Sequence, residues 1–138
     1  MTSPALRDKR APMFSTLLSV AAGGAIGASL RYLTGVGLFR LLGPTPFPVA
    51  IITVNVVGSF LMGVFVVLAA HRGLTPLSPF VMTGLLGGFT TFSAFSLEAV
   101  TLYERGDLGQ AALYVAASVV LSILGLFAGL AVARGIVA

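Results

Sequence analysis

The sequence contains no cysteine and no tryptophan, and it has a single histidine, His71. The lack of cysteine excludes disulfides and thiolate metal sites. One histidine is too few for a histidine-rich metal centre, and no nucleophile–base pair can be assembled around it. The residue types that catalysis and transition-metal binding need are almost absent, so we expect that the chain is not an enzyme.

Charged residues are also scarce, at 9% of the 138 residues, whereas hydrophobic residues make up 57%. Soluble domains carry roughly 25% charged residues. The mean hydropathy is +1.06, and a globule of this size has too much surface for its volume to hide so many apolar side chains from water. A lipid bilayer removes this difficulty, so the composition indicates a membrane protein.

The few basic residues do not gather in one patch. The net charge is +4, and most of the eight Lys and Arg residues fall between apolar runs, as they do in the loops of membrane proteins. This distribution argues against a nucleic-acid partner. Arg7, Lys9 and Arg10, followed by apolar residues, resemble a signal peptide. The apolar character continues to Tyr32, however, which favours a membrane span.

Four long runs with little or no charge stand out, at residues 14–32, 49–70, 79–103 and 109–133. A hydrocarbon core of about 30 Å needs roughly 20 helical residues. The runs lack the alternation of strands, and helices satisfy their own backbone in lipid. We therefore predict an all-α membrane protein with a single domain of four spans at residues 14–138. A polar, disordered tail at residues 1–13 precedes it.

Three of the spans carry small or polar residues at four-residue spacing, so these residues share one helix face. They are Gly23, Gly27 and Arg31 in the first span, Asn55, Ser59 and Gly63 in the second, and Tyr114, Ser118 and Ser122 in the fourth. The glycines favour close helix packing, whereas the Tyr-Ser-Ser row suits packing and pore lining equally. Asn55 indicates a functional role, because an amide in the middle of a span needs partners that lipid does not offer.

Two charged residues lie within or at the edge of the spans, and charge in a membrane usually faces protein or water. Arg31 ends the first span, where it either extends to the membrane interface or belongs to a site. Glu98 lies two helical turns beyond Thr91. Its role is open between an interfacial residue, a structural hydrogen-bond partner and a site residue.

The third span holds the most informative stretch, which reads GLLGGFTTFSAFS from Gly84 to Ser96. Paired glycines followed by two threonines weaken a helix, so we predict a break at Gly87–Thr91. Carbonyls freed by the break could hold a small hard cation. Phe92 and Phe95 share a face, and the positive edges of their rings suit an anion. The alternative is a kinked packing helix with its phenylalanines in lipid.

The stretch GGFTTFSAFS at residues 87–96, followed by Glu98, resembles the third-span signature of the Fluc/CrcB family of fluoride channels. GGAIGASLRY at 23–32 is similar to the first-span pattern of that family, and NVVGSFLMG at 55–63 is similar to its second. The chain length and the four-span layout fit as well. Ala94 departs from the pattern, since a hydroxyl residue is common there in relatives, and the basic tail is a second departure.

The resemblance implies a dual-topology homodimer, in which two antiparallel copies form two fluoride pores at their interface. It assigns the pore to Asn55, Phe92, Phe95, Tyr114, Ser118 and Ser122, with Arg31 near the vestibule. Thr91 and Glu98 are further candidates for the pore. It also implies a structural sodium ion (Na+) at the dimer interface, held by the backbone carbonyls of Gly87 and Thr90 from both copies.

We therefore expect a fluoride-selective channel in the inner (plasma) membrane that lets fluoride leave the cytoplasm passively. Fluoride binds water tightly, so a narrow pore must replace that water with donors. A small drug or cation exporter is one alternative, but it needs a membrane-embedded acid, for which Glu98 is the sole candidate. A packing subunit of a larger complex is another, and it explains the small residues but not the predicted break.

Overall fold

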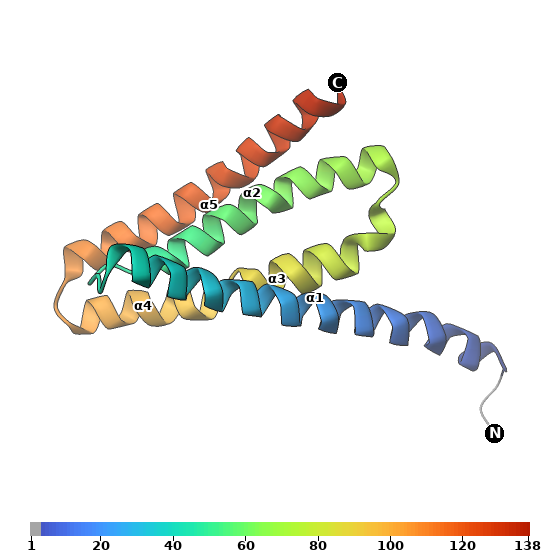
Figure 1. Ribbon diagram of the computed structural model, residues 1–138, viewed down its shortest axis with the longest axis horizontal. Helices are drawn as coiled ribbons and strands as arrows, with labels where there is room; N and C mark the ends of the chain where they lie inside the picture. Colours follow the sequence, from blue (N-terminus) through green and yellow to red (C-terminus); the bar gives the residue numbers. More distant parts are fainter. Residues whose placement is uncertain (1–3) are drawn as a thin grey trace.

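The computed structural model describes residues 4–138, with the backbone alone at residues 4–11. All regular secondary structure in the described chain is helical (Figure 1), and its elements are α1 (Pro4–Leu42), α2 (Val49–Arg72), η1 (Thr75–Leu77), η2 (Pro79–Leu86), α3 (Gly87–Phe89), α4 (Phe92–Glu104) and α5 (Leu108–Val137). The pieces from η1 to α4 together form one crossing, which is called the third span below. With α1, α2 and α5 it gives four segments long and apolar enough to cross a membrane, so the prediction of four spans is confirmed.

The first helix is longer than the sequence predicts. α1 begins at Pro4, so residues 4–13, which we expected to be part of a disordered tail, are helical, and residues 1–3 lie outside the described residues. The helix also continues beyond Tyr32 and ends only before Gly43, whose φ of 72° is left-handed. Its 39 residues measure about 58 Å at 1.5 Å per residue. Because this is about twice the hydrocarbon thickness, α1 must tilt or extend out of the bilayer.

α1 packs against the third span along glycines that leave no room for a side chain. A Cβ on Gly27 would overlap the carbonyl of Leu85, and one on Gly88 would lie 2.7 Å from the carbonyl oxygen of Gly24. The two backbones are therefore in direct contact, as small residues permit in membrane helices. The predicted packing role of the first-span glycines is confirmed.

α2 and α5 form the second pair of neighbouring helices and run parallel (Figure 1). A Cβ on Gly125 would lie against the carbonyl of Val56, and one on Gly129 would overlap the carbonyl of Phe60, four residues further along both helices. Gly63 meets α5 in the same way. These contacts fix which residues of α2 and α5 lie at the same height.

The third span is broken within the predicted range, but over fewer residues. Thr90 (ψ 160°) and Thr91 (φ −154°, ψ 117°) are extended, whereas Gly87 stays helical (φ −63°, ψ −37°). The glycine pair serves the contact with α1 instead, since Gly88 has no space for a Cβ there. The predicted break is confirmed, and the threonines rather than the glycines leave the helical geometry. The preceding η2 is a π-helix, a winding that is frequent at functional sites.

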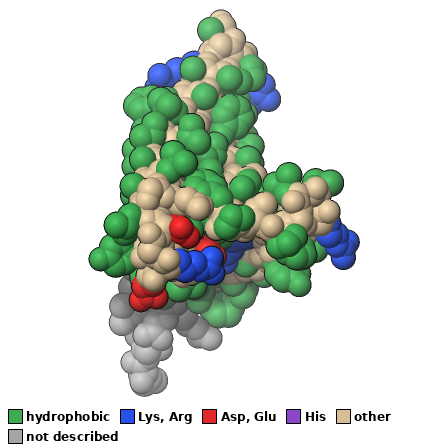
Figure 2. All heavy atoms as spheres, turned by 90° about the vertical axis from the view of Figure 1, so that its left-hand side faces the viewer, with side chains coloured by type: hydrophobic (Ala, Val, Ile, Leu, Met, Phe, Trp, Pro, Cys, Tyr) green, Lys and Arg blue, Asp and Glu red, His purple; other side chains and the backbone are tan. Residues whose placement is uncertain are grey.

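The outer surface is mostly apolar, as a lipid-facing surface must be. Large hydrophobic side chains such as Leu17, Leu30 and Phe127 are exposed on it. Figure 2 shows the end of the molecule with the α4–α5 turn, where hydrophobic side chains cover most of the view and acidic ones are confined to a small area. The fully buried side chains with the largest volumes are those of Tyr114, Leu102 and Val54.

Candidate functional site

A groove of about 390 Å³ lies between α2, the broken third span and α5. It is lined by Asn55, Gly58, Ser59 and Met62 of α2, by Thr90, Thr91, Phe92 and Phe95 of the third span, and by Ser118, Val119, Ser122, Ile123 and Leu126 of α5. Six residues that the sequence predicted to line a pore are therefore neighbours in space, namely Asn55, Thr91, Phe92, Phe95, Ser118 and Ser122. None of the lining side chains carries a formal charge.

The Asn55 side chain holds the break in place from the neighbouring helix. Its Nδ2 donates to the carbonyl oxygen of Thr91 at 3.1 Å, and its Oδ1 accepts from the Thr91 N–H at 2.8 Å. The two bonds satisfy backbone groups that a helix break would otherwise leave unpaired in the membrane. Thr91 in turn begins α4, since its Oγ1 accepts from the N–H of Ala94 at 3.1 Å. Asn55 thus finds the partners that its position in a span required.

The bond from the Thr91 N–H to Asn55 also frees a backbone acceptor before the break. In a continuous helix the Thr91 N–H would donate to the carbonyl of Gly87, four residues earlier. Here it donates to Asn55, so the Gly87 carbonyl loses that partner, and Gly87 is exposed. Carbonyl oxygens are the ligands that small hard cations prefer. The described residues contain no group of three or more His, Cys, Asp or Glu that could hold a metal instead.

Four aromatic rings form a row from the groove to the connection between α1 and α2. Phe92 lies 5.2 Å from Phe95, Phe95 lies 5.4 Å from Tyr114, and Tyr114 meets Phe47 edge to face at 5.7 Å, between ring centroids. Phe92 is 77% exposed, whereas Phe95 is 8% exposed. The two phenylalanines that the sequence paired therefore differ, because one faces outward and the other is part of the core. Phe47 was not predicted, since a lone phenylalanine between prolines gives no sequence signal.

The hydroxyl groups of the α5 row lie on the side of the helix that faces the groove. Ser118 and Ser122 line it, while Tyr114 is fully buried behind them. The hydroxyls of Tyr114 and Ser118 are buried and have no hydrogen-bond partner among the described residues. Buried polar groups without a partner are uncommon in proteins, and of these two hydroxyl-bearing residues Ser118 lines the groove whereas Tyr114 does not.

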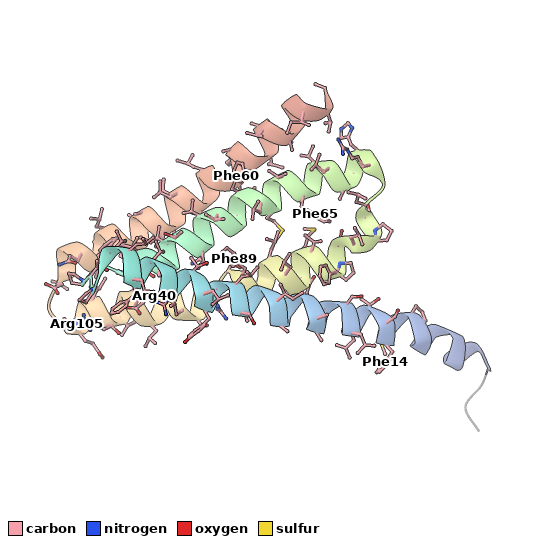
Figure 3. All side chains as sticks on the ribbon, viewed as in Figure 1. Phe14, Arg40, Phe60, Phe65, Phe89 and Arg105 are labelled. Carbon is pink, nitrogen blue, oxygen red and sulfur yellow. The ribbon has the colours of Figure 1, made fainter. Side chains whose placement is uncertain are left out.

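Arg31 and Glu98 lie apart from the groove. Glu98 lines a second hollow of about 320 Å³, together with Arg105 and the connection between α1 and α2. Figure 3 shows Arg40 and Arg105 at this same end of the molecule. Arg31 is half-buried on α1 and lines neither hollow. Neither residue therefore lines the groove, although Phe47, which contacts Tyr114, lines the same hollow as Glu98.

The groove also contains residues that the sequence did not assign to a site. Gly58 is small because a Cβ there would overlap the side chain of Thr90, so it lets the break approach α2. Ser59 lies one helical turn beyond Asn55, and Met62 lies further along the same wall. The four-residue spacing from Asn55 to Ser59 was the signal that could have identified Ser59.

Known proteins closely similar to this chain were found over nearly its whole length. The family model described as CrcB-like protein, Camphor Resistance (CrcB), matches residues 18–130. A relative from Roseobacter denitrificans is 73% identical over 122 residues, which cover 88% of this chain and 97% of the relative. Relatives from Ruegeria sp. (69% over 124 residues, 90% of this chain and 98% of the relative) and Rhodospirillum centenum (59% over 124 residues, 88% and 98%) match similarly.

All three relatives are named fluoride-specific ion channel FluC. Ion channels are not enzymes, so the expectation of a non-enzymatic protein is confirmed. The four apolar helices, together with these relatives, make the chain a multi-pass membrane protein, which in bacteria lies in the inner membrane. The resemblance read from the third span is confirmed as well, and the chain belongs to the CrcB family of fluoride-specific ion channels.

Proposed function

We propose that this chain forms a fluoride-selective channel through which fluoride leaves the cytoplasm passively. The observation that carries the proposal is the uncharged groove between α2, α4 and α5, where free hydroxyls lie beside phenylalanine rings at membrane depth. The name of the relative that is 73% identical over 122 residues supports fluoride as the ion. No energy source is needed, because hydrogen fluoride enters cells as a neutral acid and ionises inside.

The chemistry of the groove suits an anion that must lose its water. Hydroxyls of Ser118 and Ser122 and the remaining N–H of the Asn55 amide donate hydrogen bonds, and the ring edges of Phe92 and Phe95 are positively polarised. The groove has no acid that would repel an anion. Val119, Ile123 and Leu126 make the rest of the α5 wall apolar, which excludes water and strengthens the remaining electrostatic interactions.

The proposal includes a second copy of the chain in antiparallel orientation. The groove is open on one side, and Phe92 is 77% exposed at its edge, so a closed pathway needs another wall. Two inverted copies would close one groove each and give two equivalent pores. In this arrangement Tyr114 continues the row of hydroxyls that Ser118 and Ser122 form on α5, and Thr91 lies at the break of the third span. Arg31 and Glu98 belong to the entrances of the pore.

We also assign to the break a sodium ion shared by the two copies. The carbonyl of Gly87 fits a small hard cation, because Asn55 has taken its helical partner, and the carbonyl of Thr90 lies at the start of the extended segment. Two carbonyls from one copy are too few ligands, and two more from an inverted copy would complete a small site. The ion would stabilise the point where the third span of one copy crosses the third span of the other, and it takes no part in conduction.

The test is ion efflux from liposomes that contain the purified protein. Vesicles are loaded with fluoride or, separately, with chloride, and efflux is followed with ion-selective electrodes. We expect rapid loss of fluoride and negligible loss of chloride, with vesicles without protein as the control. Equal loss of both anions, or no loss of either, would contradict the proposed function.

A further inference from the structure

The α5 wall of the groove loses its hydrogen-bond donors partway along. Ser118 and Ser122 are followed one turn later by Leu126, which still lines the groove. An anion without its water needs a compensating donor at each position, because burying an unpaired charge is costly. Beyond Ser122 that donor must come from another helix.

α2 offers a hydroxyl at this height. The parallel register set by the contacts of Gly125 and Gly129 puts Asn55 at about the height of Ser122. In the same register Ser59, one turn further along α2, lies near the height of Leu126. The donors of the groove therefore pass from α5 to α2 at the point where α5 becomes apolar.

The Ser59 hydroxyl is free to bind a ligand. Elsewhere on the helices, the hydroxyls of Thr53, Ser96 and Thr101 donate to the carbonyl four residues earlier, which is the usual way for a helix to satisfy a hydroxyl in lipid. Ser59 forms no hydrogen bond of this or any other kind with the residues that the structure describes.

The Asn55 amide cannot replace the Ser59 hydroxyl as a donor, because most of the hydrogen-bonding capacity of Asn55 is already used. Its Oδ1 and one N–H are committed to Thr91, and an amide has only one further N–H to give. The uncommitted hydroxyl on the α2 wall of the groove is that of Ser59.

We propose that Ser59 is a further anion-binding residue, whose hydroxyl donates to fluoride one helical turn beyond Asn55, on the side away from Tyr114. Four residues of helix span about 6 Å, so Ser59 marks a separate position of the ion rather than a second ligand at Asn55. The inference rests on the proposed function and deepens it, since it adds a donor on α2 to those on α5.

The experiment compares Ser59→Ala with Ser59→Thr, which retains a hydroxyl, in the liposome assay. Ser29→Ala is the matched control, because it removes the same group from an exposed position on α1 where the hydroxyl donates to the Ala25 carbonyl. We expect Ser59→Ala to slow fluoride efflux about tenfold, as for the loss of a hydrogen bond to an ion, and Ser59→Thr to restore much of the rate. Ser29→Ala should match the unaltered protein, and gel filtration should show the same elution for all.

The outcomes separate this inference from the function on which it rests. If the unaltered protein releases fluoride and Ser59→Ala releases it equally fast, Ser59 does not bind the ion and the channel proposal stands. If Ser59→Thr is as slow as Ser59→Ala, the hydroxyl is not what matters and the inference fails. If the unaltered protein releases no fluoride, the proposed function fails first.

Discussion

Asn55 joins two spans through a single side chain. The hydrogen bonds between its amide and the backbone of Thr91 connect residues that are 36 positions apart in sequence. They satisfy the backbone at the break and at the same time bring Phe92 to the edge of the groove. The amide is therefore a structural support of the third span and also lines the groove.

Replacing Asn55 with alanine should destabilise the protein as well as slow fluoride efflux. The change leaves the N–H and the carbonyl of Thr91 without their partner, at a cost of about 1–3 kcal/mol for each buried group. Thermal unfolding in detergent should show a clearly lower midpoint. Thr53→Val is the control, because its hydroxyl bonds within its own helix, and its midpoint should change little. An Asn55→Ala protein as stable as the unaltered one would contradict the support role.

Phe92 and Phe95 should respond differently to the same substitution with isoleucine. Phe95 is buried against Tyr114, so Phe95→Ile should lower stability by about 1–2 kcal/mol. Phe92 is exposed, so Phe92→Ile should leave stability unchanged. Both should slow fluoride efflux sharply, since both remove a ring edge. Phe14→Ile, on the exposed part of α1 in Figure 3, is the control and should change neither property. Unaltered efflux in Phe92→Ile would remove that ring from the mechanism.

Among the helical elements, the contact between α1 and the third span decides where the break can lie. The backbones touch at Gly24 and Gly88 and again at Gly27 and Leu85. This contact holds η2 and α3 firmly against α1 up to the start of the break. The chain can leave helical geometry only after it, at Thr90, where the Asn55 amide is within reach.

The substitution Gly27→Ala should disrupt this contact. Its Cβ would overlap the carbonyl of Leu85, and backbone atoms cannot move aside as a side chain can, so we expect a loss of about 1–3 kcal/mol. Gly37→Ala on the same helix is the matched control, because a Cβ there meets nothing within 4 Å. Thermal unfolding should show a lower midpoint for Gly27→Ala alone. Equal midpoints for the two variants would show that the close contact is not needed.

For the whole molecule, the open groove and the distribution of charge bear on the proposed inverted dimer. Each of the four crossings takes the chain to the other side of the membrane. The basic residues Arg7, Lys9, Arg10, Arg72 and Arg134 therefore belong to one side and Arg31, Arg40 and Arg105 to the other. The difference is small, and it depends mainly on the N-terminal residues. Lys and Arg in loops set the orientation of a membrane protein. A bias as slight as this one permits insertion in both directions.

Single cysteines at the two ends of the molecule test this orientation directly, because the chain has no cysteine of its own. We propose Ala138→Cys and Asp107→Cys, which lie at opposite ends and leave every Lys and Arg in place (Figure 1). A membrane-impermeant maleimide is applied to spheroplasts, whose inner membrane is intact and exposed to the reagent. It should label about half of each variant if insertion occurs in both directions. Permeabilised cells, as the control, should give complete labelling. Full labelling of one variant and none of the other would show a single orientation.

Much of the architecture follows from the sequence alone. Hydropathy is a local property, so the four spans, the membrane and the absence of catalytic residues could be predicted from composition and run lengths. The break was predicted as well, because weak helix formers lie together in the third span. The stretch from Gly87 to Ser96 was specific enough to identify the family.

Only the tertiary structure decided which of these residues meet. The pairing of Asn55 with Thr91, the burial of Phe95 beside an exposed Phe92, and the place of Ser59 in the groove all depend on how separate helices pack. Sequence spacing gives the face of one helix, but it does not say which face of another helix lies opposite. That choice is made by the contacts of the glycines, which set the height of each helix against its neighbour.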